Sequence, residues 1–364
     1  MQLKDLINFF ENEFPLKLQE DYDNSGLQIG DKESEVKGVL VSLDCTEKVI
    51  EEAIKKECNV VVCHHPLLFK SIKKIAYTTE VERVIRMCIK RDISVYAIHT
   101  NLDNHPQGVN AAISDRIGLM DTSVLSPMNS ALYKLAVYLS KDLLPAMDLA
   151  IFEAGGGGIG NYSECHFRQE GVGTFKPGIL SNPSEGKIGI RSEVPEIKVD
   201  YLVEEQHLEK VLMAMRKNHI YEEVAHDIIL LENKDTRFGA GRMGTLKNSC
   251  DELTFLLQLK EIFGSKGIRY SALLNKPIKK VALCGGAGSF LIKNAISAGV
   301  DCYITSDLKY HEFFDAEQQL LLIDLGHFES EQFTSQLLMQ KLKENFTNFA
   351  IHLSVINTNP INYL

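Results

Sequence analysis

The sequence predicts an α/β protein in which a discontinuous α/β domain with a mostly parallel sheet is interrupted by an inserted α+β domain. Strand and helix patterns alternate over residues 1–124 and resume over residues 241–364, and strands separated by helices imply parallel pairing. Over residues 125–240 the order becomes β-α-β-β-α-β with an elaborated middle, which is the split arrangement of ferredoxin-like domains. We therefore expect one domain built from the two outer segments and a second domain inserted between them.

The first segment opens with a helix and continues with alternating strands and helices. The opening helix has one apolar face and ends at Pro15; the face is made of Leu3, Leu6, Ile7, Phe10 and Phe14. Short apolar runs bounded by polar residues indicate buried strands, and the stretches between them have helical periodicity. The expected elements are strands at 38–44, 59–65 and 93–100, a helix at 46–57 that Thr46 caps, and a helix at 80–92.

The middle segment contains the glycine run "FEAGGGGIG", which fits the G-x-G-x-x-G pattern through Gly155, Gly157 and Gly160. A dinucleotide loop needs a strand before the glycines and a helix after them, whereas here a helix precedes and a strand follows. We therefore interpret the run as a helix end and a tight turn. The expected strands lie at 133–140, 161–168, 171–178, 196–204 and 225–232, the helices at 142–154 and 207–219, and a loop at 178–187.

The last segment returns to alternating helices and strands. The expected helices lie at 250–264 and 289–299, and the expected strands at 279–285, 301–307, 320–326 and 349–357. In "VALCGGAGSF", Gly285, Gly286 and Gly288 stand between a strand and a helix. Backbone N–H groups at such a turn could hold a phosphate or carboxylate, and a tight βα turn without a ligand is an equal alternative.

Composition excludes several classes of function. The chain has 364 residues, of which 45% are hydrophobic and 24% charged, and a net charge of −10, so it should fold compactly and should not be a general nucleic-acid binder. No apolar run reaches the length of a membrane-spanning helix. The eight cysteines form no C-x-x-C pair and no signal peptide is recognisable, so we expect a reducing cytoplasm.

Five residues of the types that bind metal ions lie at or beyond the ends of three of the expected strands. His64 and His65 close one strand before Pro66, so both rings can reach one site if the backbone turns there. Asp103 follows a second strand, and His327 and Glu331, spaced i, i+4, follow a third. The five residues at what we expect to be one edge of one sheet are His64, His65, Asp103, His327 and Glu331.

Three imidazoles and two carboxylates suit Zn, Fe, Mn, Co or Ni better than Ca or Mg. Five protein ligands exceed the number that one catalytic ion normally takes, so two divalent ions bridged by a carboxylate are the sharper hypothesis. His99 is expected inside its strand as a packing residue, and His105 in surface loop. Beyond the strand at 301–307, His311 could act as general acid or base and Lys309 could meet phosphate, unless both only begin a helix.

The motifs together resemble the Nif-three-like family, called GTP cyclohydrolase 1 type 2. They are "DNSGLQIGD", "CHHPLLF", "HTNLDN", "CGGAGSF", "SDLKYHE", "DLGHFESE" and "INTNPI". The middle segment is similar to the PII/CutA-like insert of long bacterial members. Tyr22 stands where the family usually has Trp, and Ser306 where a Gly is frequent; both lie outside the ligand set.

The resemblance implies a toroidal homohexamer with two divalent metal ions per subunit, held by the same five residues. It also implies hydrolysis of GTP to formate and 7,8-dihydroneopterin triphosphate, with the turn at Gly285 to Gly288 on phosphate and His311 moving protons. The same centre would also serve a phosphoesterase acting on nucleotides. A non-enzymatic metal-binding scaffold or regulator is the alternative from another class.

Overall fold

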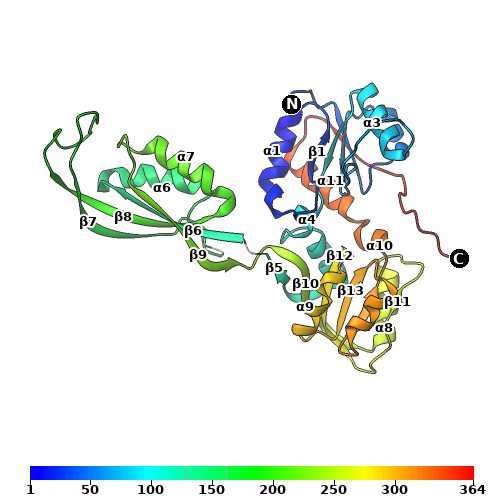
Figure 1. The fold of residues 1–364 in the computed structure, drawn as a ribbon. Coiled ribbons are helices and arrows are strands. Elements are labelled where there is room, and N and C mark those ends of the chain that lie inside the picture. The colour runs from blue at the N-terminus through cyan, green and yellow to red at the C-terminus, as the bar shows by residue number, and fades with distance from the viewer. Residues whose placement is uncertain (129, 161) are drawn as a thin grey trace. The chain divides into compact units, whose positions relative to one another are not determined.

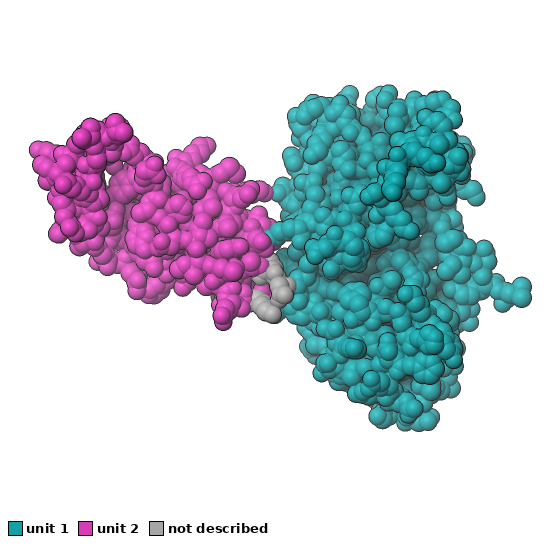
Figure 2. All heavy atoms as spheres, viewed as in Figure 1, with its two compact units in different colours: residues 1–128, 236–364 teal, residues 129–235 magenta. Residues whose placement is uncertain are grey.

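The computed structural model describes every residue except 129 and 161, and the side chains of residues 130 and 234 are also left out of the description. The chain forms two compact units, which Figure 2 colours separately. The first combines residues 1–128 with 236–364, and the second comprises residues 129–235.

The first unit contains two sheets, and the N-terminal one has five strands in the order β1-β4-β3-β2-β15. The strands β15, β2, β3 and β4 pair in parallel, and β1 pairs with β4 in the antiparallel sense. The strand bounds are β1 Gly26–Ile29, β2 Gly38–Ser42, β3 Val60–Cys63, β4 Ser94–Ala97 and β15 Ala350–Leu353.

Helices cover both faces of this sheet (Figure 1). α1 and α11 pack on one face, where Phe10 stacks on Tyr96 with ring centroids 5.3 Å apart. α2 and α3 bury Ile50 and Val84 on the opposite face. Thr46 caps α2 as predicted, since its side chain accepts a hydrogen bond from the amide of Val49. The bounds are α1 Leu3–Glu13, α2 Glu47–Lys55, α3 Glu80–Arg91 and α11 Thr334–Asn345, with the short η1 Leu16–Leu18 and α4 Thr100–Asp103 between them.

The second sheet has six strands in the order β11-β14-β13-β12-β10-β5. β12, β13 and β14 pair in parallel, whereas β11, β10 and β5 are antiparallel to their neighbours. The helices α5 and α8 contribute Ile113 and Phe255 to the core on one face, and α9 contributes Ile292 on the other. The bounds are β5 Leu119–Pro127, β10 Gly239–Cys250, β11 Arg269–Tyr270, β12 Ile278–Ala287, β13 Cys302–Ser306, β14 Leu321–Asp324, α5 Val109–Ile117, α8 Glu252–Ile262, η4 Ser289–Leu291, α9 Ile292–Ser297, η5 Tyr310–Ala316 and α10 His327–Glu331.

The prediction of one sheet for the two outer segments is therefore wrong, because they form two, and the second sheet is mixed. The sequence reading missed β5 and β10. Their sequences, "LMDTSVLSP" and "GAGRMGTLKNSC", are rich in residues that are depleted in strands and lack a clean alternation. Long-range pairing between these two strands and with β12 sets their conformation instead.

The second unit has one four-stranded antiparallel sheet in the order β7-β8-β6-β9. Its elements follow in the order β6, α6, β7, β8, α7, β9. Both long helices pack on one face, where Met147 and Val211 join the core. The bounds are β6 Ser130–Leu139, α6 Leu144–Glu153, β7 His166–Phe175, β8 Ser192–Glu204, α7 Leu208–Asn218 and β9 His226–Asp235, with short η2 Lys141–Leu143 and η3 Glu205–His207.

The second unit differs from the predicted pattern of elements at β7 and agrees with it at the glycine run. The strands expected at 161–168 and 171–178 are one continuous strand, β7, because β8 pairs with its whole length; residue 161 lies outside the described part. The glycine run ends α6 as predicted. Gly155 has a φ of 99°, and the amide of Gly156 donates to the carbonyl of Ile151.

Among the described residues, no helix combines the length and the apolar character that crossing a membrane requires.

Candidate metal centre

A sharp turn after β3 places His64 and His65 beside one another. β3 ends at Cys63, and the amides of both histidines donate to the same acceptor, the carbonyl oxygen of Leu43, at 3.0 Å. The backbone therefore leaves the extended form, in which neighbouring side chains point to opposite faces. The two imidazole rings lie with centroids 4.9 Å apart and 47° between their planes.

The other three predicted ligands come from two further segments. Asp103 is the last residue of α4, the short helix after β4. His327 and Glu331 begin and end α10, which follows β14. The predicted single sheet edge is thus corrected: β3 and β4 belong to the five-stranded sheet and β14 to the six-stranded one. The site lies where chain segments from the ends of two sheets meet.

Glu331 is at the centre of the cluster. Its Oε2 lies 3.0 Å from Nε2 of His65 and 3.0 Å from Nε2 of His327, and these two nitrogens are 3.2 Å apart. Nε2 of His64 lies 3.9 Å from the same oxygen and 3.6 Å from Oδ1 of Asp103. All five predicted ligands therefore direct polar atoms into one small volume.

His99 joins this cluster, although the sequence reading placed it inside a strand as a packing residue. β4 ends at Ala97, and His99 lies just before α4. Its ring centroid is 5.2 Å from that of His64 and 5.5 Å from that of His65. The motif "HTNLDN" held the signal that could have found it, a histidine two residues past a short strand. Three overlapping groups have ligand atoms within 4.8 Å of one another: His64, His65 and His99; His65, His327 and Glu331; and His64, Asp103 and Glu331.

The four histidines share one arrangement, in which Nδ1 bonds to an acceptor outside the cluster. With Nδ1 as the donor, Nε2 is left as the inward-facing atom, which is how proteins orient histidines toward metal ions. Three acceptors are carboxylates and one is a backbone carbonyl. The pairs are His64 with Ile98 O at 2.8 Å, and His65 with Asp44, His99 with Asp23 and His327 with Asp307, each at 2.7 Å.

Two buried polar atoms in the cluster have no hydrogen-bond partner, Nε2 of His64 and Oδ1 of Asp103. An unsatisfied buried nitrogen or oxygen is unfavourable, because it has lost water and gained nothing. A cation between these atoms would satisfy both. The donor set of imidazole and carboxylate groups also suits a transition-metal ion. The residues therefore fit a metal.

Burial and neighbouring charges strongly shift the pKa values of four residues in the cluster. Burial lowers the pKa of His64 to about 3. Burial also opposes the charge of His65 and His327, but their carboxylate partners outweigh it and raise the pKa of His65 to about 9 and of His327 to about 11. Burial and the nearby charge of Glu331 raise the pKa of Asp103. In the metal-free protein, protons thus occupy positions that a metal cation would take.

Gly286 makes room for Glu331. A Cβ built on Gly286 would lie 2.3 Å from Oε1 of Glu331, and the residue has a φ of 62°. Glycine is therefore required here both by its backbone conformation and by the close approach of the carboxylate.

Gly286→Ala is expected to weaken metal binding because it displaces the central carboxylate. Gly264→Ala is the matched control, since Gly264 has a φ of 61° but faces open space. Both changes should reduce the free energy of unfolding by about 1–3 kcal/mol through backbone strain, and only Gly286→Ala should lower the metal content per chain, measured by elemental analysis. Equal metal content in the two variants would contradict the close-packing argument.

The glycine turn does not offer free amides to a phosphate. The amide of Gly285 donates to Oδ1 of Asn110, that of Gly286 to Oγ of Ser330 and that of Gly288 to Oγ1 of Thr305, at 2.9, 3.1 and 2.9 Å respectively. The alternative of a tight turn without a ligand is therefore the better description of Gly285, Gly286 and Gly288.

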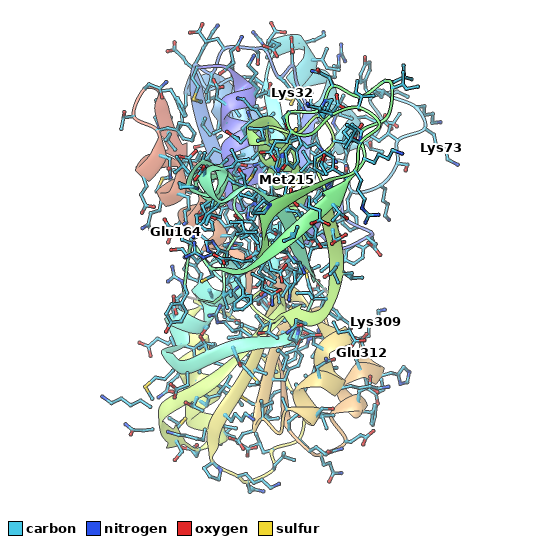
Figure 3. All side chains as sticks on the ribbon, turned by 90° about the vertical axis from the view of Figure 1, so that its left-hand side faces the viewer. Lys32, Lys73, Glu164, Met215, Lys309 and Glu312 are labelled. Atoms are coloured by element: carbon cyan, nitrogen blue, oxygen red, sulfur yellow. The ribbon has the colours of Figure 1, made fainter. Side chains whose placement is uncertain are left out.

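Lys309 and His311 are exposed and do not line the cavity around the cluster. Lys309 lies beside Glu312, whose carboxylate accepts its backbone amide at 2.7 Å (Figure 3). His311 stacks edge-on against Tyr310 in η5. Within one chain the structure therefore does not bring either residue to the histidine–carboxylate cluster, whereas it does bring His99 there.

The cluster opens into a cavity of about 560 Å³. Its wall is lined by the segments that follow β2, β3 and β4, by residues of β10 and β12, and by the C-terminal segment through Asn359 and Ile361. Thr358 anchors that segment by a hydrogen bond to Asp44, the partner of His65. The final motif "INTNPI" thus closes one side of the candidate centre.

Fold and site together define an α/β protein with a histidine- and carboxylate-rich centre of the kind that binds transition metals. The family model described as Duf34/NIF3 (NGG1p interacting factor 3) matches residues 1–360. The chain belongs to this family.

Similar proteins cover the whole chain. A Bacillus subtilis (strain 168) protein named GTP cyclohydrolase 1 type 2 homolog is 38% identical, over 99% of this chain and 98% of its own length. A Staphylococcus epidermidis relative of the same name is 34% identical over 100% of both. Among solved structures, a Bacillus cereus protein related to NIF3 has a TM-score of 0.90 and 35% identity, covering 100% of this chain and 99% of that one.

Proposed function

We propose that the protein is a metal-dependent hydrolase that holds two divalent metal ions per chain. The observation that carries the proposal is the position of Glu331, which belongs to two of the ligand groups at once. In this arrangement His65 and His327 would hold one ion, His64 and Asp103 the other, and Glu331 would bridge them. The metal would be Zn, Fe, Mn, Co or Ni.

When bound, two such ions supply Lewis acidity and activate water at neutral pH. The chain itself supplies a proton carrier in His99. Asp23 is buried, and its Oδ1 accepts from Nδ1 of His99 at 2.7 Å while its Oδ2 accepts from the amide of Thr100 at 3.0 Å. This fixed carboxylate holds the His99 tautomer whose Nε2 accepts a proton from the attacking water and then returns it to the leaving group.

His99→Gln is expected to lower turnover by about 100-fold or more while the metal content stays unchanged. The reason is that the substitution removes the proton carrier but none of the five proposed ligands. Metal content by elemental analysis and initial rates should be measured on the same preparation. A parallel fall in metal content would instead make His99 a metal ligand.

The proposed reaction is hydrolysis of GTP to formate and 7,8-dihydroneopterin triphosphate, in line with the name of the relatives. Metal-loaded protein incubated with GTP should give equal amounts of formate and of a pterin that fluoresces after oxidation. Release of phosphate from nucleotides without formate would show that the protein is a phosphoesterase and not a cyclohydrolase.

A reducing cytoplasm is the proposed compartment, since all eight cysteines are free thiols.

A second candidate function, a metal-binding scaffold or regulator, is favoured by the separate second unit. Its β-α-β-β-α-β order supports the expected PII/CutA-like insert, and it has its own cavity of about 540 Å³, lined by Tyr138 and Glu196 among others.

We also propose that the protein forms a homohexamer. Light scattering should give the mass of six chains of 40.8 kDa each, and absence of turnover on every nucleotide would leave the scaffold as the function.

Metal binding is expected to weaken as the pH falls from 9 to 6. His65, with a pKa of about 9, and His327, with a pKa of about 11, are protonated in the metal-free protein over this range. Each proton that the metal displaces therefore lowers the apparent affinity by about tenfold per pH unit. Isothermal titration calorimetry with Zn²⁺ in buffers of different ionisation enthalpy measures the released protons. An affinity that does not change with pH would contradict the assignment of these two ligands.

A further inference from the structure

The cavity beside the five proposed metal ligands has an aromatic rim, made of Tyr22, Phe69 and Phe290. All three line the cavity, yet they are 63%, 47% and 59% exposed. Tyr22 and Phe69 contact each other edge-on with centroids 6.4 Å apart, and Phe69 lies 6.1 Å from the ring of His99. Exposed aromatic side chains at the mouth of a cavity mark a binding surface. Here that surface leads directly to the metal cluster.

The wall of this cavity is acidic. Among the described residues that line it there is no Lys or Arg, and five are carboxylates: Glu20, Asp44, Asp103, Asp307 and Glu331. Proteins bind phosphate groups mainly with Arg, Lys and free backbone amides, and the amides of the nearby glycine turn are already bonded within the chain. Apart from metal ions, the wall therefore offers a phosphate chain no Lys or Arg side chain, and its carboxylates repel the negative charge.

Glu20 provides a different kind of recognition. One of its carboxylate oxygens accepts from Nδ2 of Asn104 at 3.0 Å, which leaves acceptor capacity facing the cavity. A carboxylate accepts N–H donors from the edge of a nitrogen heterocycle, as Glu and Asp do with nucleobases. The aromatic rim offers flat surface to the same kind of ring. Cavity size agrees, since about 560 Å³ suits a ligand of nucleoside size.

We propose that this cavity selects its substrate by a planar nitrogen heterocycle, which stacks on the aromatic rim and donates N–H groups to Glu20, and not by phosphate. Any phosphates of the substrate extend out of the cavity. The inference rests on the proposed hydrolase function, because it names the part of the substrate that meets the metal centre.

Isothermal titration of metal-stripped protein tests this directly, because it removes the attraction of phosphates for metal ions. Guanosine and GTP should bind with affinities within about threefold of each other, and inorganic tripolyphosphate should not displace guanosine. GTP binding more than about tenfold tighter than guanosine would overturn the inference. Absence of guanosine binding to both metal-stripped and metal-loaded protein would also overturn it.

Single substitutions in the cavity test which side chains contact the heterocycle. Tyr22→Ala, Phe69→Ala and Glu20→Gln should each weaken guanosine binding by about tenfold with metal content unchanged. Tyr310→Ala is the matched control, since Tyr310 is 74% exposed and lies outside the cavity lining; its affinity should equal that of the parent protein. Unchanged guanosine affinity in the three cavity variants would overturn the proposal.

The two proposals fail in different ways. Protein that binds guanosine through the aromatic rim but releases no formate from GTP would refute the proposed reaction and leave ring selection intact. If Tyr22→Ala and Phe69→Ala shift the mass in light scattering and leave guanosine binding unchanged, the rim is a contact between chains. That outcome would end the inference on ring selection while the metal content still tests the hydrolase.

Discussion

Glu331→Gln is expected to abolish stable metal binding and with it all hydrolytic turnover. The substitution keeps the size of the side chain but removes the charge at the centre of the cluster. Oε2 of Glu331 lies 3.0 Å from Nε2 of both His65 and His327, and the side chain is only 3% exposed. At such a buried position, loss of a shared anionic ligand affects both proposed ions at once. We expect the metal content after dialysis to fall below about one tenth of that of the parent protein.

Glu329→Gln provides the matched control for this experiment. Glu329 lies on the same helix and is also buried, but its carboxylate accepts from Nδ2 of Asn359 at 3.2 Å and belongs to none of the three ligand groups. It should retain its metal. Circular dichroism of both variants checks the fold. Glu331→Gln protein that is folded and keeps its full metal content would refute the proposed bridging role.

Asp44→Asn is expected to weaken metal binding by about 10–100-fold without removing a ligand. Asp44 accepts from Nδ1 of His65 at 2.7 Å and also holds Thr358 of the C-terminal segment. A neutral amide accepts more weakly, so Nε2 of His65 becomes a poorer ligand and its ring is less firmly oriented. The affinity for Zn²⁺ is measured by competition with a chelator of known affinity.

The control for Asp44→Asn is Asp227→Asn in the second unit. Asp227 accepts from the hydroxyl of Tyr138 at 2.9 Å, so the same chemical change breaks a comparable bond far along the chain from every proposed ligand. The affinity for Zn²⁺ should not change in this variant. Equal affinities of the Asp44 and Asp227 variants would show that the carboxylate behind His65 does not tune the site.

Local pattern was sufficient for most elements of the first sheet. The apolar runs that predict β2 and β3 are buried on both sides, and the amphipathic stretches that predict α1 to α3 have side chains such as Phe10 and Val49 with no exposed surface. Capping and hydrophobic periodicity involve residues only a few positions apart in the chain, so the local sequence is enough to predict these elements. β5 and β10 lack such a pattern, so these two strands of the second sheet were missed, whereas β12, β13 and β14 were expected.

His99 and His311 show the same difference at the level of the site. The sequence predicts His99 inside the strand at 93–100 and His311 beyond the strand at 301–307, and the residue type alone does not show which of them reaches the cluster. His99 faces His64 and His65 because β4 ends at Ala97 and the chain turns there into α4. His311 is carried outward on η5. The residue at which a short strand ends sets the direction in which the next side chains point. Such boundaries are the features that are predicted least reliably from a sequence.

The sequence by itself determined which residue types could form a metal centre: two adjacent histidines at a strand end, an aspartate after the next strand, and a histidine and glutamate one helical turn apart. Only the tertiary structure decided that these groups meet between two sheets, that His99 joins them, and that a carboxylate or carbonyl stands behind every imidazole. The reason is physical. His65 and Glu331 are 266 residues apart in the chain but 3.0 Å apart in space, and no local periodicity encodes a contact that the packing of two sheets into one shared core creates.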